Sequence, residues 1–83
     1  MKRIGWDTQA RAHIRAIDRA NAMQVLQVIH RYAASGAGDV KKLQPPLSGL
    51  RLRAGDWRVF FTEPQPNAMR ITGVYHRGRA YRG

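Results

Sequence analysis

Hydrophobic positions recur at helical spacing in the first half of the chain. Within residues 8–17, Ala10, Ile14 and Ile17 follow one another at intervals that place them on one face of a helix. A longer helix is predicted over residues 19–34, where one apolar stripe repeats with the helical period. This stripe consists of Ala22, Val25, Leu26, Ile29, Tyr32 and Ala33.

Residue types at both ends of the longer helix support its limits. Asp18 can accept a hydrogen bond from a backbone N–H group that the first helical turn leaves unpaired. Gly36 follows the helix, at the position where glycine readily takes the left-handed conformation that ends helices.

After residue 49 the pattern changes to the alternation of a β-strand. Residues 50–53 alternate strictly, and so do residues 57–59, which predicts two strands. A two-residue loop, Gly55-Asp56, suits the type II′ turn of a hairpin, which requires glycine first.

Further strands are expected on either side of these elements. Residues 1–6 are predicted to form a short opening strand, and residues 69–74 a third strand after a turn at residues 64–67. Residues 39–49 contain Pro45-Pro46 and are expected to form a connector without regular structure. The order β-α-α-β-β-β predicts a single α+β domain over residues 1–83. Its two N-terminal helices would cover one face of a small, mainly antiparallel sheet.

The hairpin separates apolar from basic side chains. The Gly55-Asp56 loop pairs Arg53 with Arg58 and Arg51 with Phe60, and paired residues share a face of the sheet. One face then carries Leu50, Leu52, Val59 and Phe61, and the other carries Arg51, Arg53, Arg58 and Phe60. We expect the apolar face to receive the helices and the basic face to be free for function.

Arginines at these positions point to an anionic partner. Arg53 and Arg58 face each other, which destabilises a hairpin, and Asp56 is the acid expected nearby. A solvated basic face is one explanation, and a phosphate supplied by a partner is the other. Guanidinium groups bind phosphate through paired hydrogen bonds and can stabilise charge that develops on it.

Composition supports a polyanionic partner. The 83 residues include 15 Lys and Arg against 5 Asp and Glu, a net charge of +10, and no cysteine. Disulfides, thiolate zinc sites and cysteine nucleophiles are thereby excluded. The dispersed acids make a two-metal nuclease site implausible, so any phosphodiester cleavage is expected to be metal-free, without a cofactor. With no signal peptide or membrane-spanning segment in the sequence, we expect a cytoplasmic protein.

The last nine residues hold further candidates. His76 stands beside Arg77 and Arg79, and is either a proton carrier or an uninvolved surface side chain. His13 and His30 fall within the helices, where a structural role is expected. Phe60, with Tyr75 or Tyr81 from the tail, could stack on unpaired bases. Basic residues expected to contact single-stranded nucleic acid, either RNA or DNA, are Arg53, Arg79 and Arg82.

The chain resembles the RelE/ParE toxin superfamily of type II toxin–antitoxin systems, most closely its RelE branch, over almost its whole length. The resemblance is carried by residues 39–43, 47–61 and 74–82. Its most specific part is Leu-Arg-Leu-Arg-Ala-Gly-Asp-Trp-Arg-Val at residues 50–59, and the C-terminal match is His76-Arg77 followed by Ala80-Tyr81-Arg82. The chain departs from the family pattern at Gly49, where some relatives carry a cation, and at Leu50, where tyrosine is common.

The resemblance implies a metal-independent endoribonuclease that cuts mRNA in the ribosomal A site. The ribose 2′-OH would attack the adjacent phosphate and leave a 2′,3′-cyclic phosphate. Arg58 and Arg77 fall where the family stabilises transition-state charge, and Arg51 where it orients the phosphate. Tyr81 matches a tyrosine that stacks on a base or transfers a proton, and His76 is the alternative proton carrier.

An acidic antitoxin is the implied protein partner, expected to cover the arginines or displace the tail. Two other functions remain open. One is a ParE-like toxin that inhibits DNA gyrase without cutting RNA. The other is an inactive relative that binds only RNA or its antitoxin.

Overall fold

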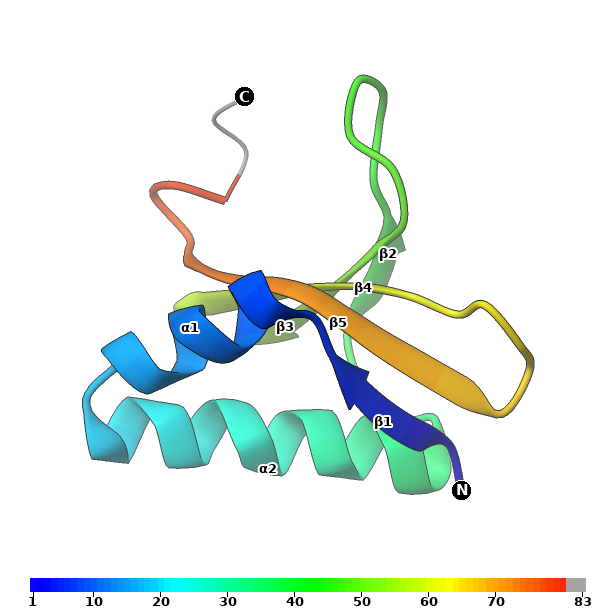
Figure 1. Ribbon diagram of the computed structural model, residues 1–83, viewed down its shortest axis with the longest axis horizontal. Helices are drawn as coiled ribbons and strands as arrows, with labels where there is room; N and C mark the ends of the chain where they lie inside the picture. The colour runs from blue at the N-terminus through cyan, green and yellow to red at the C-terminus, as the bar shows by residue number, and fades with distance from the viewer. Residues whose placement is uncertain (81–83) are drawn as a thin grey trace.

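The computed structural model describes residues 1–80, which contain two helices and five strands (Figure 1). The helices are α1 (Thr8–Ala16) and α2 (Arg19–Ser35). The strands are β1 (Arg3–Trp6), β2 (Val40–Lys42), β3 (Leu50–Ala54), β4 (Trp57–Thr62) and β5 (Ala68–His76). Neither of these helices is long and apolar enough to cross a membrane.

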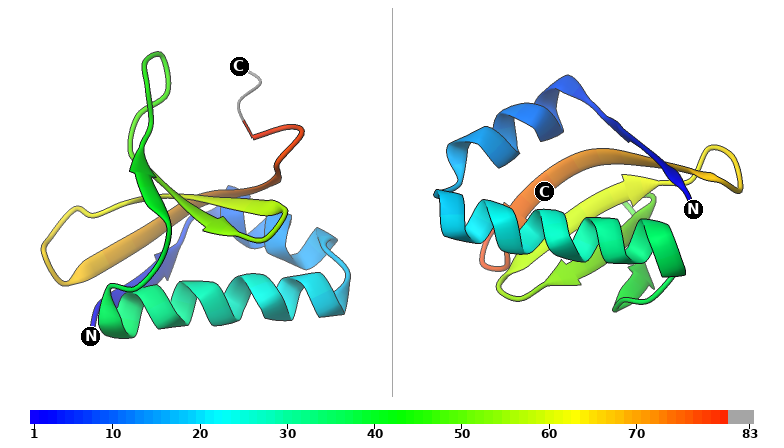
Figure 2. Two further views of the ribbon diagram at one scale, coloured as in Figure 1. Left: turned by 180° about the vertical axis from the view of Figure 1, so that it is seen from behind. Right: turned by 90° about the horizontal axis from the view of Figure 1, so that it is seen from below.

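The five strands form one sheet in the order β1-β5-β4-β3-β2. β1 is parallel to β5, and the other neighbours are antiparallel. Both helices lie on the same side of this sheet (Figure 2). The predicted α+β class, with two N-terminal helices on one face of a mainly antiparallel sheet, is therefore confirmed.

Both predicted ends of the long helix are present. The Asp18 side chain accepts a hydrogen bond from the Asn21 backbone N–H at 3.4 Å. Gly36 ends the helix with φ of 77°, in the left-handed region, and its N–H donates to the Tyr32 carbonyl at 2.8 Å. A helix stop of this kind is favourable at glycine because no Cβ opposes a positive φ.

The apolar core fills the space between the helices and the sheet. Val25 and Ile29 of α2 are fully buried, and Ala10 is the buried residue of α1. The sheet contributes seven buried side chains to the same cluster: Leu52, Ala54, Val59, Phe61, Met69, Ile71 and Val74. This core packs one face of the sheet against both helices and leaves the opposite face without helix cover.

Two differences from the predicted elements bear on the functional site. Residues 39–49 were expected to lack regular structure, but Val40–Lys42 forms the edge strand β2, paired with β3. Three residues are too few to show alternation, and the strand forms because β3 offers an unpaired edge. β5 continues to His76, two residues beyond the predicted end, because Tyr75 and His76 pair with Arg58 and Trp57 of β4.

Candidate functional site

The β3–β4 hairpin has the register predicted from its loop. Arg53 pairs with Arg58, and Arg51 pairs with Phe60. Gly55 has φ of 62°, and Asp56 is not among the residues of positive φ, as a type II′ turn requires. Arg51, Arg53 and Arg58 therefore share the sheet face opposite the helices, which we call the arginine face.

Neighbouring strands extend the arginine face in both directions. Lys41 of β2 is the register partner of Arg51, and Tyr75 of β5 is the register partner of Arg58. In Figure 1 the loop between β2 and β3 and residues 77–80 both leave the sheet on the side away from the helices. The arginine face therefore lies between these two segments.

Arg51 is the most buried cation of this face. Its side chain is 7% exposed, and its Nη2 lies 3.5 Å from Oδ1 of Asp39, just before β2. The expectation that Asp56 would be the nearby acid was therefore incomplete. The family resemblance includes Asp39, but the alternation pattern assigns it no contact with Arg51, because only the unpredicted strand β2 brings it beside β3.

Arg58 is half-buried and bound to the hairpin turn. Its Nη1 donates to the carbonyl of Gly55 at 2.7 Å and to that of Trp57 at 3.0 Å. Carbonyl oxygens carry partial negative charge, so these bonds offset the repulsion between Arg58 and its partner Arg53. Arg53 itself is exposed.

Arg77 lies beside the same turn. Its backbone N–H donates to the Asp56 carbonyl at 2.8 Å, and its Nε lies 3.9 Å from the Asp56 carboxylate. Both side chains of this ion pair are about two-thirds exposed (65% and 68%), so solvent and salt weaken the pair. The structure thus brings Arg58 and Arg77 to the two residues of one turn, and a phosphate could displace the weak Asp56 contact.

Phe60 is on the predicted face but is not open to solvent. It is 9% exposed, in a small cluster with Leu43 and Ala80, and Leu47 and Tyr75 pack against this cluster. The structure therefore gives Phe60 a packing role, and the expected stacking on a base would require this cover to move. Tyr75 is half-buried on the same face, with its ring 5.1 Å from that of Phe60.

His76 is directed away from Arg58. It is the register partner of Trp57, and the two rings meet edge to face with centroids 5.3 Å apart. Because residues alternate between faces along β5, His76 falls on the helix side, whereas Tyr75 shares the face of Arg58. Arg79 is exposed in the turn that follows, and its N–H donates to the His76 carbonyl at 2.8 Å. The predicted site residues Tyr81 and Arg82 lie outside the described residues.

Titratable groups do not gather into a metal site in the described part of the chain. Within residues 1–80, no three His, Cys, Asp or Glu side chains are grouped in a way that could hold an ion. His13 has a structural contact, since its Nδ1 accepts a hydrogen bond from the Val74 backbone N–H at 3.1 Å.

Similar folds are found among solved structures. An archaeal RelE–RelB complex from Pyrococcus horikoshii matches with a TM-score of 0.73 and 23% identity, over 95% of this chain and 98% of that one. The toxin–antitoxin complex RelBE2 from Mycobacterium tuberculosis matches with a TM-score of 0.72 and 21% identity, over 92% and 98%. The YoeB dimer from Staphylococcus aureus matches with a TM-score of 0.70 and 21% identity, over 90% and 97%.

Comparison of the amino-acid sequence alone gives no match. Neither the scan against family models nor the search of curated proteins finds a match to this chain. The resemblance noted in residues 50–59 and 76–82 therefore gains its support from the three-dimensional likeness. On the strength of strand order, helix placement and coverage of nearly the whole chain, this protein has the fold of the RelE-like toxins.

Proposed function

We propose that this protein is the toxin of a type II toxin–antitoxin pair and that it cuts mRNA, in the ribosomal A site, without a metal ion. One observation carries the proposal. The register of β3, β4 and β5 gathers Arg51, Arg58 and Tyr75 on a sheet face that no helix covers. The toxin–antitoxin structures of the same fold support both the class of function and an antitoxin partner.

The proposed reaction is an internal transfer at phosphorus. The ribose 2′ oxygen attacks the adjacent phosphorus and gives its proton to a base. The bond from phosphorus to the 5′ oxygen of the next nucleotide breaks, and that oxygen takes up a proton. A 2′,3′-cyclic phosphate and a 5′-OH remain.

The arginines stabilise the charge that develops on the phosphate. Arg58 contacts Gly55 and Arg77 contacts Asp56 of the same turn, and both would bind the non-bridging oxygens. Arg51 lies two residues before Arg53, the register partner of Arg58, and lines a pocket with the loop that follows β2. It would orient the neighbouring phosphate. A guanidinium does not release its proton near neutral pH, so none of these groups is the base.

Proton transfer is assigned to Tyr81 or His76. His76 contacts Trp57 rather than Arg58, so its use as a base requires the turn at residues 76–79 to rearrange. Two single variants, His76→Gln and Tyr81→Phe, distinguish these residues. The one whose replacement lowers the cleavage rate more is assigned the proton transfer.

Arg58→Ala is the decisive variant. Expressed without antitoxin, it should lose growth arrest and cut mRNA at least about a hundredfold more slowly, because a charge on the developing transition state is gone. Antitoxin binding should survive, since the antitoxin would contact a wider surface. Arg31→Ala, an exposed arginine of α2 on the helix side, is the matched control and should remain toxic.

Mapped products separate the alternatives. Cuts within codons of translated mRNA support the proposal. Linearised DNA with a damage response would instead identify a gyrase inhibitor, and the absence of arrest would identify an inactive relative. Full toxicity of Arg58→Ala would refute the role given to the arginine face.

A further inference from the structure

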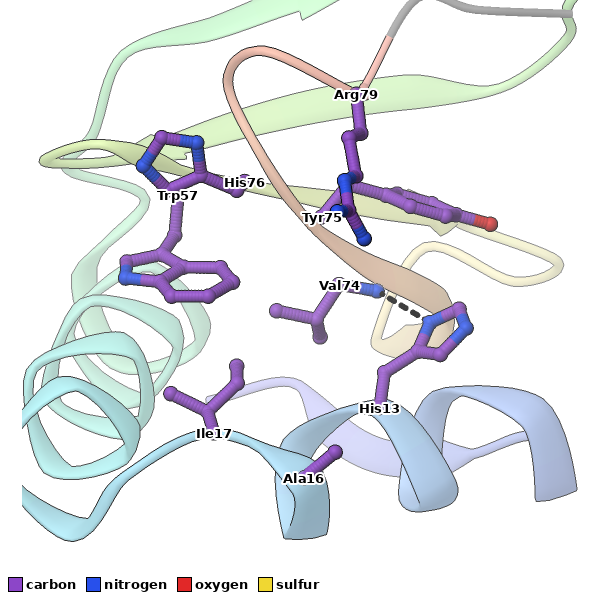
Figure 3. A pocket seen from close by; sticks show the side chains of 8 residues that line it. All are labelled: His13, Ala16, Ile17, Trp57, Val74, Tyr75, His76 and Arg79. Carbon is purple, nitrogen blue, oxygen red and sulfur yellow. Dashed lines mark hydrogen bonds between the residues drawn. The ribbon is translucent and has the colours of Figure 1, made fainter.

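A hollow of about 640 Å³ opens beside the second half of β5, at the margin of the sheet (Figure 3). This volume lies within the roughly 300–1,000 Å³ that small-molecule sites occupy. The lining side chains on which the argument rests are His13, Ala16, Trp57, Tyr75, His76 and Arg79. Of these residues, Tyr75, His76 and Arg79 were candidates from the sequence, whereas His13, Ala16 and Trp57 were not.

The hollow exists because β1 and β5 differ in length. β1 pairs with β5 only as far as Ile71, whereas β5 continues to His76. Beyond that point α1 lies along the free edge, where Gln9 donates to the Thr72 carbonyl at 3.4 Å and His13 accepts from the Val74 N–H at 3.1 Å. The space between α1 and the last residues of β5 remains open.

The walls of the hollow are held in place by hydrogen bonds and ring contacts. The Trp57 and His76 rings meet edge to face at 5.3 Å. The turn after β5 is closed by the Arg79 N–H on the His76 carbonyl at 2.8 Å and by the Gly78 N–H on His76 Nδ1 at 3.4 Å. Figure 3 shows the Arg79 side chain directed into the hollow. A ligand would therefore meet a largely preformed site and would lose little entropy in ordering it.

The chemistry of the lining fits a base together with its phosphate. Indole and imidazole rings stand beside aliphatic side chains, and Arg79 provides a permanent positive charge. No acidic residue is among the lining side chains drawn from residues 1–80. Planar apolar surface next to a single cation favours a nucleotide, because bases stack on aromatic rings and guanidinium binds phosphate.

Tyr75 connects this hollow to the arginine face. It is the register partner of Arg58, it lines the hollow, and its ring lies 4.9 Å from that of His13. A single strand of RNA that lies on the arginine face could therefore pass over Tyr75 to the hollow without leaving the protein surface.

We propose that this hollow binds the base of one nucleotide of single-stranded RNA, next to the segment held on the arginine face, with Arg79 on its phosphate. The choice of RNA rests on the proposed function. The consequence is a sequence preference, because the hollow would admit some bases more readily than others.

Trp57 fluorescence tests the proposal directly. A Trp6→Phe variant leaves Trp57 as the single indole, and Arg58→Ala in the same chain should allow expression without toxicity. The probe is a 2′-O-methyl RNA hexanucleotide, which cannot be cut, together with copies that carry an abasic residue at each position in turn. We expect the intact probe to quench Trp57, and one abasic copy to bind about tenfold more weakly with the quenching lost.

Two substitutions locate the effect. Arg79→Ala should weaken binding of the intact probe about tenfold, because a charge-assisted contact is lost. Ala16→Leu places a larger side chain at the lining of the hollow and should abolish the quenching. Its matched control, Ala12→Leu, changes an exposed alanine of α1 that does not line the hollow and should bind as the parent does.

Each remaining outcome overturns the proposal. Equal quenching by all abasic copies would mean that no base enters the hollow, and normal binding by Ala16→Leu would place the RNA elsewhere. A Trp57 signal that responds only to the cognate antitoxin would assign the hollow to a protein partner.

The test is independent of cleavage. Base-dependent quenching, together with no mRNA cleavage in cells by the parent chain that keeps Arg58, would keep the nucleotide site and reject the nuclease. Cleavage in cells without base-dependent quenching would do the reverse.

Discussion

The two faces of the β3–β4 hairpin are built from alternate residues of the same strands, yet one face forms the apolar core and the other carries the arginines. On the helix side, Leu52 and Val59 are fully buried and Phe61 is 1% exposed, in a core shared by both helices. On the arginine face, Arg51 is paired with an acid and Phe60 belongs to a small separate cluster. The hairpin thus isolates charge from the main core by alternation alone.

The arginine face buries fewer apolar side chains than the helix side does. Its apolar cluster has three buried members, Leu43, Phe60 and Ala80, from the loop after β2, from β4 and from the segment after β5. These contacts hold both flanking segments above the arginines, whereas the helix side depends on neither segment. Substitutions on the two sides should therefore change different properties.

Adjacent phenylalanines provide the largest contrast. Phe61→Ala should lower the free energy of unfolding by about 3–5 kcal/mol, because it empties a site enclosed by helices and sheet. Phe60→Ala should lower the free energy of unfolding by roughly 2 kcal/mol, because its smaller cluster can collapse around the missing ring. It should also lower the rate of RNA cleavage, because the flanking segments lose a shared contact. Urea denaturation followed by circular dichroism gives both values. Equal losses would show that the two faces share one core.

Gly49 joins the flanking loop to β3 and tests the link between the faces. Its φ is 97°, and an added Cβ would lie 2.8 Å from the Phe61 carbonyl oxygen. Gly49→Ala should cost about 2 kcal/mol through backbone strain and this contact. Gly5→Ala is the control, because its Cβ would meet nothing within 4 Å, and a change within about 0.5 kcal/mol is expected. Similar urea-denaturation midpoints for the two variants would contradict the prediction that Gly49→Ala introduces backbone strain.

Replacing Asp39 should lower the stability of the fold and strengthen the binding of RNA. Asp39→Asn leaves Arg51 without its counter-charge and should lower the free energy of unfolding by about 1 kcal/mol. Single-stranded RNA should bind more tightly, and the slope of log K against log salt should steepen by about 0.7, one additional phosphate contact.

Asp7→Asn is the matched control for this charge. It removes one carboxylate that pairs with Arg70, next to β1. A smaller stability loss with an unchanged salt slope is expected there, because the Arg70 side chain is 63% exposed and solvent weakens this pair. A steeper slope in both variants would show that net charge, rather than Arg51, governs binding.

The smallest effect concerns Tyr32, on the helix side. Burial raises the pKa of this phenol, and the Glu63 carboxylate, which accepts its hydrogen bond at 3.0 Å, raises it further. Unfolded tyrosine loses its proton near pH 10, before the folded chain does. The stabilisation is therefore present below pH 10 and is lost as the pH rises through the folded-state pKa.

Tyr32→Phe should remove this dependence. Between about pH 10 and pH 11 the free energy of unfolding should fall more steeply in the parent than in the variant, by less than about 1 kcal/mol. Thermal unfolding across this range measures the difference. Parallel curves would mean that Tyr32 titrates alike in both states.

The amino-acid sequence by itself determined the features that depend on neighbours along the chain. The spacing of Ala10 and Ile14 set a helix, Asp18 and Gly36 marked the limits of the next one, and the Gly55-Asp56 loop fixed the hairpin register. Each of these rests on local geometry, on 3.6-residue or two-residue periods and on turn chemistry, so the face of every hairpin side chain followed without tertiary information.

Only the tertiary structure decided which distant segments meet. It placed Asp39 beside Arg51, covered Phe60, and turned His76 toward Trp57. These contacts depend on the order of strands in the sheet and on how far β1 extends along β5, and no local pattern encodes either. The alternation along the chain therefore predicts that three arginines share a face of the sheet. The packing of remote segments determines which of these arginines remain accessible to a phosphate.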